Sequence, residues 1–457
     1  MKAILVVMLV LGSIPFILSR PYIGLLVGAW IGYMSPHRFA GGFATTLPLA
    51  LLIAAITVVA IFISKDKEQE RKIPWAPPVI VLAVFIAWMS MTTQFAFEPA
   101  LAKIEWERVL KIQFAIFLTL YLINTKFKLN LLVWTIVLSI GFYGVKGGIF
   151  AAATGGNYRV WGPPGTFIEG NNELAIALVL IIPLVRYLQL QATNKWMKMG
   201  LMGFLGLCTL AVIASYSRGA FISLVPAFLM MIFFSKHRKV LFLVVAIGSV
   251  GALFALPDQW FDRMNTISTE EEDESMQGRY DAWYLAYWVA KDHPFTGGGY
   301  RMFTQKTYEK YDHHVDNFRD AHSIYFETMG EHGFVGFFLY LAVNFLGFLT
   351  GFKVRKLAGT KEEYAWAKDL AIMLQIAMVC WAIGGAFKGM AYWDLPYHYI
   401  VILVIAESIL KREREKEELV EDGAVALGDQ SEEAEPESER FTGGKFGISK
   451  RKKSKKI

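Results

Sequence analysis

Cysteine is scarce in this chain: only Cys208 and Cys380 occur among its 457 residues. Both lie inside long apolar segments, so a disulfide framework is excluded and each is interpreted as a small apolar core residue. The sequence also lacks a Walker-type phosphate loop, a Gly-rich dinucleotide fingerprint and an HExxH motif. These absences argue against ATP-driven transport and zinc proteolysis. The net charge of +6 is accompanied by no motif that reads a nucleic-acid groove.

Long apolar segments, by contrast, are abundant. Hydrophobic residues make up 54% of the chain and the mean hydropathy is +0.38, against roughly 45–50% apolar residues in soluble domains. A helix needs about 20 apolar residues to span the hydrocarbon layer, and these segments lack the alternation of a barrel strand. The sequence therefore predicts an all-α, polytopic membrane protein. The predicted spans lie near residues 45–64, 76–95, 109–123, 129–147, 172–190, 198–214, 219–235, 240–256, 324–352, 367–388 and 393–410.

The first 36 residues allow two interpretations. Segments 3–18 and 22–34 are apolar but short, and Pro21 between them breaks or kinks a helix. They form either two short spans or one broken span, so the expected total is 12 or 13 transmembrane helices. A cleaved signal peptide is the alternative for residues 1–18, but no small-residue cleavage site follows.

Connections rich in Lys and Arg alternate along the chain with connections that have few of them. Because short basic loops stay on the cytoplasmic side of a membrane, we place all the basic ones inside. The C-terminal tail then lies in the cytoplasm, and the connections 148–171 and 257–323 lie outside. The basic connections are at residues 65–72, 126–128, 195–198, 236–239 and 353–361.

The last 47 residues, 411–457, are almost devoid of large apolar side chains and carry an acidic block followed by a basic end. This composition predicts a disordered cytoplasmic tail. Its basic end is either solvated or in contact with anionic lipid headgroups. Three regions result: an N-terminal transmembrane module at 1–125, a second transmembrane module at 126–410 that contains the loop 257–323, and the tail.

The polar segment 257–325 is the most unusual part of the chain. Five of the eight histidines fall between His293 and His332, and several arginines accompany them. Titratable and cationic side chains gathered between two predicted spans indicate chemistry, or the binding of an anion, at the membrane surface.

Arg218 lies at the outer junction of two predicted spans, after Ser217 and before Gly219 and Ala220. A cation at the end of an apolar segment can simply snorkel to the interface. Positive residues are scarce on this side, however, and the small neighbours allow a ligand or another helix to approach closely. We therefore favour a binding role for Arg218.

A second element begins at Arg279 and continues through Trp283 to Trp288. Interleaved aromatic and basic residues are typical of an interfacial helix. They also suit an anionic lipid headgroup that carries sugars, because aromatic faces pack on sugar rings and Arg offers a planar fork to phosphate. The glycine turn at 297–299 adds backbone N–H groups, which are a weak signal for anion binding.

His322 lies at the outer mouth of the span that starts near residue 324. A histidine at a helix start is often a capped, structural residue. Asp320 is two residues away and can orient an imidazole for base catalysis. His322 is therefore a stronger candidate for the base than His293, His313 or His314.

The order of these elements resembles a known superfamily. Ser-Arg-Gly-Ala at 217–220, Gly-Arg at 278–279 with Trp283, His-Pro-x-x-Gly-x-Gly at 293–299 and Ala-His-Ser-x-Tyr-x-Glu-x3-Glu-x-Gly-x-x-Gly at 321–336 resemble the O-antigen ligase and polymerase superfamily of bacterial envelopes. Trp-Gly-Pro-Pro-Gly-Thr-Phe at 161–167, with 171–175, 20–24 and 36–38, is similar to the O-glycosylation ligases associated with exosortase systems. The resemblance covers roughly residues 1–410, and makes 126–410 the ligase-like catalytic domain.

The resemblance implies a membrane glycosyltransferase without cofactor or metal. Its donor would be an undecaprenyl-pyrophosphate-linked glycan, and its acceptor a hydroxyl of a protein, lipid or glycan. It implies that His322 is the catalytic histidine and that Arg218 and Arg279 hold the pyrophosphate, on the periplasmic face of the bacterial cytoplasmic membrane. The predicted donor-binding set also contains Arg301, Trp283 and Asn172.

The residues alone lead to the same chemistry, because a departing pyrophosphate needs positive charge and a hydroxyl nucleophile needs a base. Polymerisation with the same donor is an open alternative. A transporter of lipid-linked glycan is another, although it should bury ionisable residues at mid-bilayer and the predicted spans contain few. The acidic run 270–274 is interpreted as a solvated connector, with Mg²⁺ binding through its carboxylates as the alternative.

Overall fold

The computed structural model describes residues 2–64, 71–265, 270–311 and 318–432, with only the backbone described at 249–250, 252–255, 262–265, 270–276 and 421–432. The chain divides into two units, Met1–Leu410 and Lys411–Ile457. Within the described residues every regular element is a helix and there is no strand. The predicted all-α architecture is confirmed.

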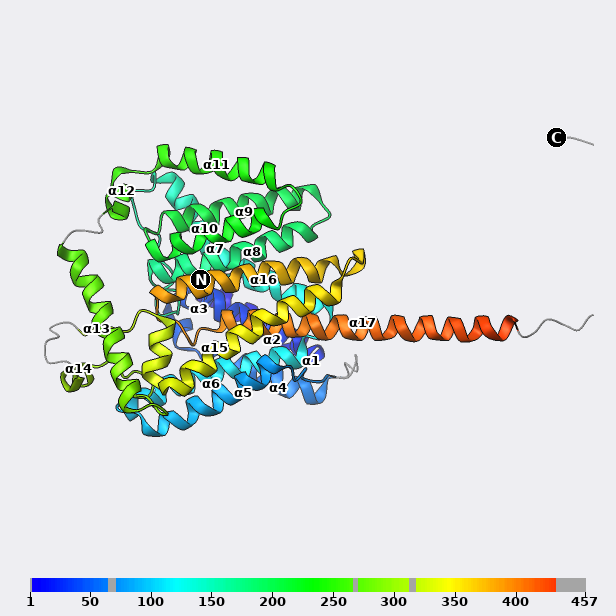
Figure 1. Cartoon of the computed structure of the whole chain (residues 1–457), viewed down its shortest axis with the longest axis horizontal. Helices are drawn as coiled ribbons and strands as arrows, with labels where there is room; N and C mark the ends of the chain where they lie inside the picture. The colour runs from blue at the N-terminus through cyan, green and yellow to red at the C-terminus, as the bar shows by residue number, and fades with distance from the viewer. Residues whose placement is uncertain (1, 65–70, 266–269, 312–317, 433–457) are drawn as a thin grey trace, which may run out of the picture. The chain divides into compact units, whose positions relative to one another are not determined.

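Helices of the first unit run back and forth in a bundle (Figure 1). Those of the N-terminal third are α1 (Lys2–Ser19), α2 (Pro21–Met34), α3 (Pro36–Ala40), η1 (Gly42–Thr46), α4 (Leu49–Ile63), α5 (Pro77–Thr92), η2 (Thr93–Phe95) and α6 (Pro99–Leu122). The middle contributes α7 (Lys126–Ala153), α8 (Asn171–Gln191), α9 (Lys195–Ile213), α10 (Arg218–Phe233), α11 (Arg238–Ala255), α12 (Asp258–Asn265), α13 (Glu270–Asp292) and α14 (Gln305–Tyr311). The chain continues with α15 (Ile324–Ala358), η3 (Glu362–Tyr364), α16 (Ala365–Gly384), η4 (Gly385–Phe387) and α17 (Asp394–Glu432).

Every predicted span coincides with a helix. The first 36 residues form two helices rather than one broken span, because the extended backbone of Arg20 ends α1 and Pro21 occupies the first position of α2, which suits its fixed φ. Seven helices within the described part are long and apolar enough to cross a membrane, namely α1, α5 with η2, α7, α8, α9, α15 and η3 with α16 and η4. Three apolar helices are shorter: α2, α4 and α10. The polytopic membrane class is confirmed, whereas these criteria alone give fewer spans than the 12 or 13 expected.

The centre of the bundle is formed by α8 and α16, whose most apolar windows are 83% and 72% buried. A helix that is apolar all round belongs in such a position. Helices α7 and α9 pack closely because glycines face the contact: a side chain at Gly148 would collide with the Leu207 carbonyl, and one at Gly144 with Cys208. Small residues that bring backbones together are a common means of helix association in membranes.

Polar connections gather at the two ends of the first unit. At one end Gln191 donates to Asp369 over 3.0 Å and Lys126 lies over the ring of Trp366. At the other end the Asn171 amide donates to the Ser215 carbonyl over 2.8 Å, and we call this the site end. Helix α8 joins the two, since its 21 residues span about 30 Å. The basic connections at 126–128 and 195–198 therefore lie opposite the candidate site residues, as the alternation of charges predicted.

The segment expected to be an extramembrane loop is largely helical and contains α12, α13 and α14 (Figure 1). In α13 the buried residues Ala282, Leu285, Ala286 and Val289 recur at helical spacing and pack in a small core with residues such as Met302. This is the stripe of an amphipathic helix. The interpretation of the run from Arg279 to Trp288 as a helix was correct, and it packs on protein.

The second unit is helical as far as Glu432, where the composition predicted disorder from residue 411. The prediction was wrong for 411–432. Opposite charges four residues apart, such as Lys411 with Glu415 and Arg414 with Glu418, support an isolated helix. The basic end at 450–456 lies outside the described residues.

Candidate functional site

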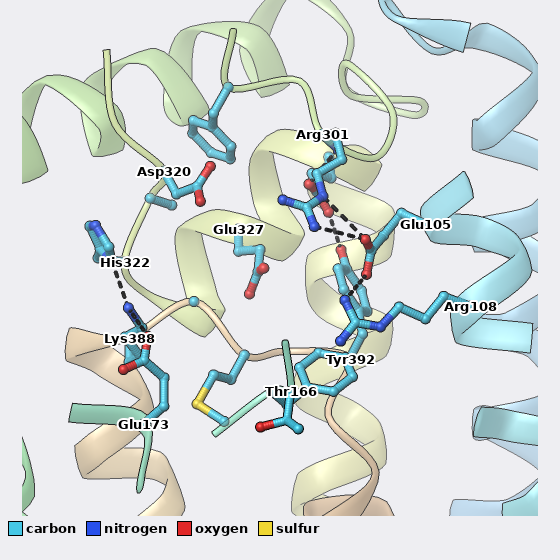
Figure 2. Close-up of a pocket in the computed structure, with 16 residues that line it drawn as sticks. Glu105, Arg108, Thr166, Glu173, Arg301, Asp320, His322, Glu327, Lys388 and Tyr392 are labelled. Carbon is cyan, nitrogen blue, oxygen red and sulfur yellow. Dashed lines mark hydrogen bonds and ion pairs between the residues drawn. The ribbon is translucent and has the colours of Figure 1, made fainter. Parts of the chain in front are cut away.

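A cavity of about 210 Å³ lies at the site end of the bundle (Figure 2). Its walls come from segments far apart in the sequence: α6, the start of α8, the connection after α13, the outer turns of α15 and the connection before α17. The charged residues that line it are Glu105, Arg108, Glu173, Arg301, Asp320, His322, Glu327, Glu331 and Lys388.

His322 lines this cavity from the connection just before α15. Its φ of 44° is left-handed, a conformation uncommon for a residue with a side chain. Two hydrogen bonds hold the segment: Trp283 Nε1 donates to the Ala321 carbonyl over 2.7 Å, and the Tyr308 hydroxyl donates to the Arg319 carbonyl over 2.7 Å. Strained backbone of this kind persists only where the surroundings hold it, so the position of the imidazole is imposed by α13 and α14.

Lys388 and Glu173 form a pair beside His322. Lys388 Nζ lies 2.5 Å from Glu173 Oε1 and 3.4 Å from His322 Nδ1. An ammonium group has protons to donate and no lone pair, so Nδ1 accepts and a neutral ring then carries its proton on Nε2. Figure 2 shows this chain of three side chains on one wall of the cavity.

Positive charge surrounds the imidazole. Burial lowers the pKa of His322, and the charges of Lys388, Arg279 and Arg319 lower it further, to about 4. The charge of Arg279 also acts on Arg218. The charge of Arg279 thus acts on both other residues predicted to be catalytic, Arg218 and His322, and Lys388 and Arg319 add two cations that act on His322. Such a cluster is suited to an anion.

Arg218 occupies the first position of α10, where the Ser217 side chain caps the helix by accepting from the Ala220 N–H over 3.3 Å. A side chain at Gly219 would lie 3.2 Å from the Phe387 side chain in η4. The small residue after Arg218 therefore serves the packing of another segment. This was one of the two explanations that the sequence allowed for the small neighbours.

Arg301 lines the cavity, but its charge is neutralised. Its guanidinium donates to Glu105 Oε2 at 3.0 and 3.1 Å, and its backbone N–H donates to Glu331 Oε1 over 2.7 Å. Burial alone would lower the pKa of Arg301, but the neighbouring Glu105 carboxylate outweighs it and the pKa is raised. We expect less anion binding from Arg301 than from Arg218 or Arg279.

The glycine turn at 297–299 forms hydrogen bonds with α15. Gly333 has a φ of 67° and interrupts the helix, which leaves carbonyl groups of the preceding turn without their usual partners. The N–H groups of Gly298 and Gly299 donate to the carbonyls of Gly330 and Glu331 over 2.8 and 2.9 Å. These two N–H groups therefore pair with carbonyls exposed by the kink in α15, which explains the glycines without a bound anion.

Of the five predicted donor-binding residues, only Arg301 lines the cavity; the other four, Arg218, Arg279, Trp283 and Asn172, do not. The ring of Trp283 stacks on Phe326 with centroids 4.9 Å apart, and its N–H supports the carbonyl next to His322. Asn172 lies in the first turn of α8 between Asn171, which binds Ser215, and Glu173, which lines the cavity. Trp283 and Asn172 therefore contact or adjoin residues that line the cavity.

Several lining residues escaped the sequence reasoning. Glu327 accepts the Ala391 N–H over 2.9 Å, and Glu331 accepts the Tyr392 hydroxyl over 2.6 Å. A usable signal existed for Lys388, since it is a single cation in a connection otherwise free of Lys and Arg. For Glu105 no local signal existed, because its partner Arg301 is remote in the sequence.

The acidic run 270–274 has no described side chains, so the alternative of Mg²⁺ binding there falls outside what the structure describes. Elsewhere in the described chain, no group of three or more His, Cys, Asp or Glu side chains is arranged to hold a metal ion.

Fold and site define a multi-pass, all-helical membrane protein with a cavity at one end of the bundle that is lined by charged residues of both signs, with further cations acting on His322. Residues 201–341 match the family model described as O-antigen ligase, and residues 1–193 match that of a family of unknown function, DUF5935. No curated protein is significantly similar to the chain. The first match supports the O-antigen ligase superfamily and a membrane glycosyl-transfer function. It includes Arg218, Arg279 and His322, whereas Lys388 lies beyond both matches.

Proposed function

We propose that the protein transfers a glycan from a polyprenyl-pyrophosphate donor to an acceptor hydroxyl on the extracytoplasmic face of the membrane. The acceptor oxygen forms a bond to the anomeric carbon of the first sugar, and the bond from that carbon to the phosphate oxygen breaks. The bonding electrons leave with the polyprenyl pyrophosphate. The hydroxyl proton goes to His322 Nδ1, the ring nitrogen that carries no proton, where the hydroxyl takes the place of Lys388 Nζ. O-glycosylation like that of the exosortase-associated ligases fits this reaction.

The cluster of cations around His322 carries the proposal. Arg218, Arg279, Arg319 and Lys388 act on one another or on the imidazole, and charge fixed in a partly dehydrated site stabilises a leaving pyrophosphate without reorganisation. The cavity beside them has room for a sugar, and its carboxylates accept hydrogen bonds from hydroxyl groups.

An apolar groove beside His322 supports a lipid-linked donor. It has a volume of about 270 Å³ and starts at Ile324 and Tyr325, two and three residues after His322. It continues along α15 and α16 past Tyr340 to Phe348 and Met378, and apolar side chains form most of its lining. A prenyl chain in this groove would place its pyrophosphate at the cations.

Ligation and polymerisation share this donor chemistry, and the site favours neither. A transporter that only binds the headgroup is less consistent with the geometry. The ionisable side chains that line the cavity gather at the site end, whereas a transporter should hold its ligand near the middle of the bilayer.

The proposal is tested with purified protein in neutral lipid nanodiscs, a polyprenyl-pyrophosphate oligosaccharide and a hydroxyl acceptor. We expect the sugar to appear on the acceptor and free polyprenyl pyrophosphate in equal amount. We expect EDTA to leave the rate unchanged, because cationic side chains replace a metal at the leaving group. Complete loss in EDTA with recovery in Mg²⁺ would instead assign a metal role to the carboxylates at 270–274.

Lys388 should set the pH range in which His322 works. Because the neutral imidazole is the active form, kcat/KM should fall as the pH drops through the pKa of His322, which is about 4. Lys388→Met removes a cation that lowers this pKa, so the acidic limb should move toward pH 6.5 while the maximal rate falls. In the donor complex the negative pyrophosphate offsets the charge of the cations and raises the pKa of His322. The acidic limb of the kcat profile should therefore lie at higher pH than the acidic limb of the kcat/KM profile.

Rates between pH 4 and 8 check this prediction, with Glu173→Gln as a second variant that keeps the ammonium. Lys306→Met is the matched control, because Lys306 pairs with Glu98 and does not line the cavity. An unchanged pH profile in Lys388→Met would show that Lys388 does not act on the titrating group.

A further inference from the structure

A second cavity, of about 260 Å³, lies beside the site cavity and belongs to neither the groove nor the cation cluster. It is formed by α3, the last turns of α7 and the connection that leads to α8. The side chains that define its character are Phe39, Tyr143, Lys146, Arg159, Trp161 and Pro163.

The charge in this cavity is positive and uncompensated. Lys146 and Arg159 line it and no acidic residue does. Lys146 Nζ lies 5.0 Å from the centre of the Phe39 ring, and the Arg159 guanidinium lies 6.0 Å from that of Tyr216. Neither forms an ion pair with a carboxylate in the described part of the chain. Two cations that face a hollow with only aromatic neighbours are free to bind an anion.

Exposed aromatic rings accompany the cations. Trp161 is 60% exposed, although it lies in a cavity lining next to two prolines. Phe39 is 42% exposed and forms a T-shaped contact with Phe142, with the Lys2 and Lys146 ammonium groups over its ring. A flat aromatic surface beside a hydrogen-bond donor is what a sugar ring requires, since the C–H face of the ring packs on the aromatic and its polar groups bind the donors.

A short turn separates this cavity from the site cavity. Pro164 lines the second cavity and Thr166 lines the first. Two residues span at most about 7 Å between their Cα atoms. Gly165 between them has a φ of 72° and donates its N–H to Glu169 Oε2 over 2.8 Å, and any side chain there would collide with Arg38. The turn at Gly165 thus joins the linings of the two cavities, and its conformation is fixed by the backbone.

We propose that the second cavity binds the sugar units beyond the reacting one, in a glycan that carries carboxylate or phosphate groups. This inference rests on the proposed transfer reaction and adds its substrate class: an acidic oligosaccharide that crosses the turn at Gly165. The chain of sugars belongs either to the donor or to a glycan acceptor, because both meet at the reacting carbon. Trp161 stacks on a ring, and Lys146 and Arg159 bind its acidic groups.

The test compares the transfer of three donors by purified protein in neutral lipid nanodiscs: a monosaccharide donor, a neutral tetrasaccharide donor and a tetrasaccharide donor with glucuronate. Trp161→Ala and the double variant Lys146→Ala with Arg159→Ala should lower kcat/KM for the acidic tetrasaccharide about three- to tenfold. Both should transfer the monosaccharide at the parental rate. A parallel series with monosaccharide donor and acidic or neutral tetrasaccharide acceptors separates the two sources of the glycan.

Trp75→Ala and Lys291→Ala are the matched controls. Trp75 is also 60% exposed but lies in the connection before α5, and Lys291 is an exposed cation over the Trp288 ring at the site end. An equal loss for all donors and acceptors, restored by anionic phospholipid in the nanodisc, would assign the cavity to a lipid headgroup and overturn the inference. So would parental rates for every substrate. Absence of monosaccharide transfer by the parent protein would instead contradict the transfer reaction itself.

Discussion

Replacing His322 is expected to lower glycan transfer by about 10²- to 10⁴-fold, the contribution of a positioned acid or base. The imidazole lines the cavity, three cations act on it, and its lowered pKa keeps it neutral near pH 7. Membrane insertion and donor binding should persist, because Arg218 and Arg279 do not depend on the ring. Transfer rate and donor affinity are measured on the same preparation.

The choice of substitution matters because His322 has a left-handed backbone with a φ of 44°. Alanine tolerates this conformation poorly, whereas Asn adopts it more readily than most residues. His322→Asn therefore keeps the local fold and removes the base, and it should be as inactive as His322→Ala. His293→Asn is the control, because His293 packs against Phe97 outside the cavity. Near-parental turnover of His322→Asn would return His322 to a structural role.

The helical spans were predictable because a membrane helix is a continuous apolar segment that can be found in the local sequence. Seven of those in the described part are apolar runs long enough to cross a membrane, α2, α4 and α10 are shorter apolar runs, and Pro21 marks the break between α1 and α2. The packing order was not predictable, since the approach of Gly148 to Leu207 depends on which helices become neighbours. The helical state of 411–432 was missed because composition was weighed more heavily than charge spacing.

In the candidate site, too, some features could be predicted from local sequence and others depend on the packing of remote segments. Arg218, Arg279 and His322 were predicted from short motifs whose order resembles one superfamily, and in the structure the charge of Arg279 acts on the other two. The pairs that tune the site were missed: Lys388 with Glu173, and Arg301 with Glu105. Members of each pair lie on helices or connections that meet only in the folded bundle. Sequence patterns therefore proposed the candidate residues, and the fold was needed to show which of them are neutralised by a carboxylate.

Arg279 should be the cation whose loss costs most after His322, because it is the one that acts on both Arg218 and His322. A lost charge-assisted hydrogen bond to phosphate costs about 1.5–3 kcal/mol, which is about tenfold to a hundredfold in rate where the bond forms mainly in the transition state. Arg279→Ala should show this loss. Arg279→Lys keeps the charge without the planar fork and should lie between Arg279→Ala and the parent.

The measurement is transfer rate against donor concentration for Arg279→Ala, Arg279→Lys, Arg218→Ala and the double variant. If the two arginines hold one pyrophosphate, their effects should not add, because residues that share a partner are coupled. Arg238→Ala is the control, since Arg238 is exposed at the opposite end of the bundle. A change confined to KM would mean that Arg279 binds the donor equally in the ground and transition states. Parental rates at every donor concentration would exclude Arg279 from the site and make Arg319, the remaining arginine that acts on His322, the next residue to test.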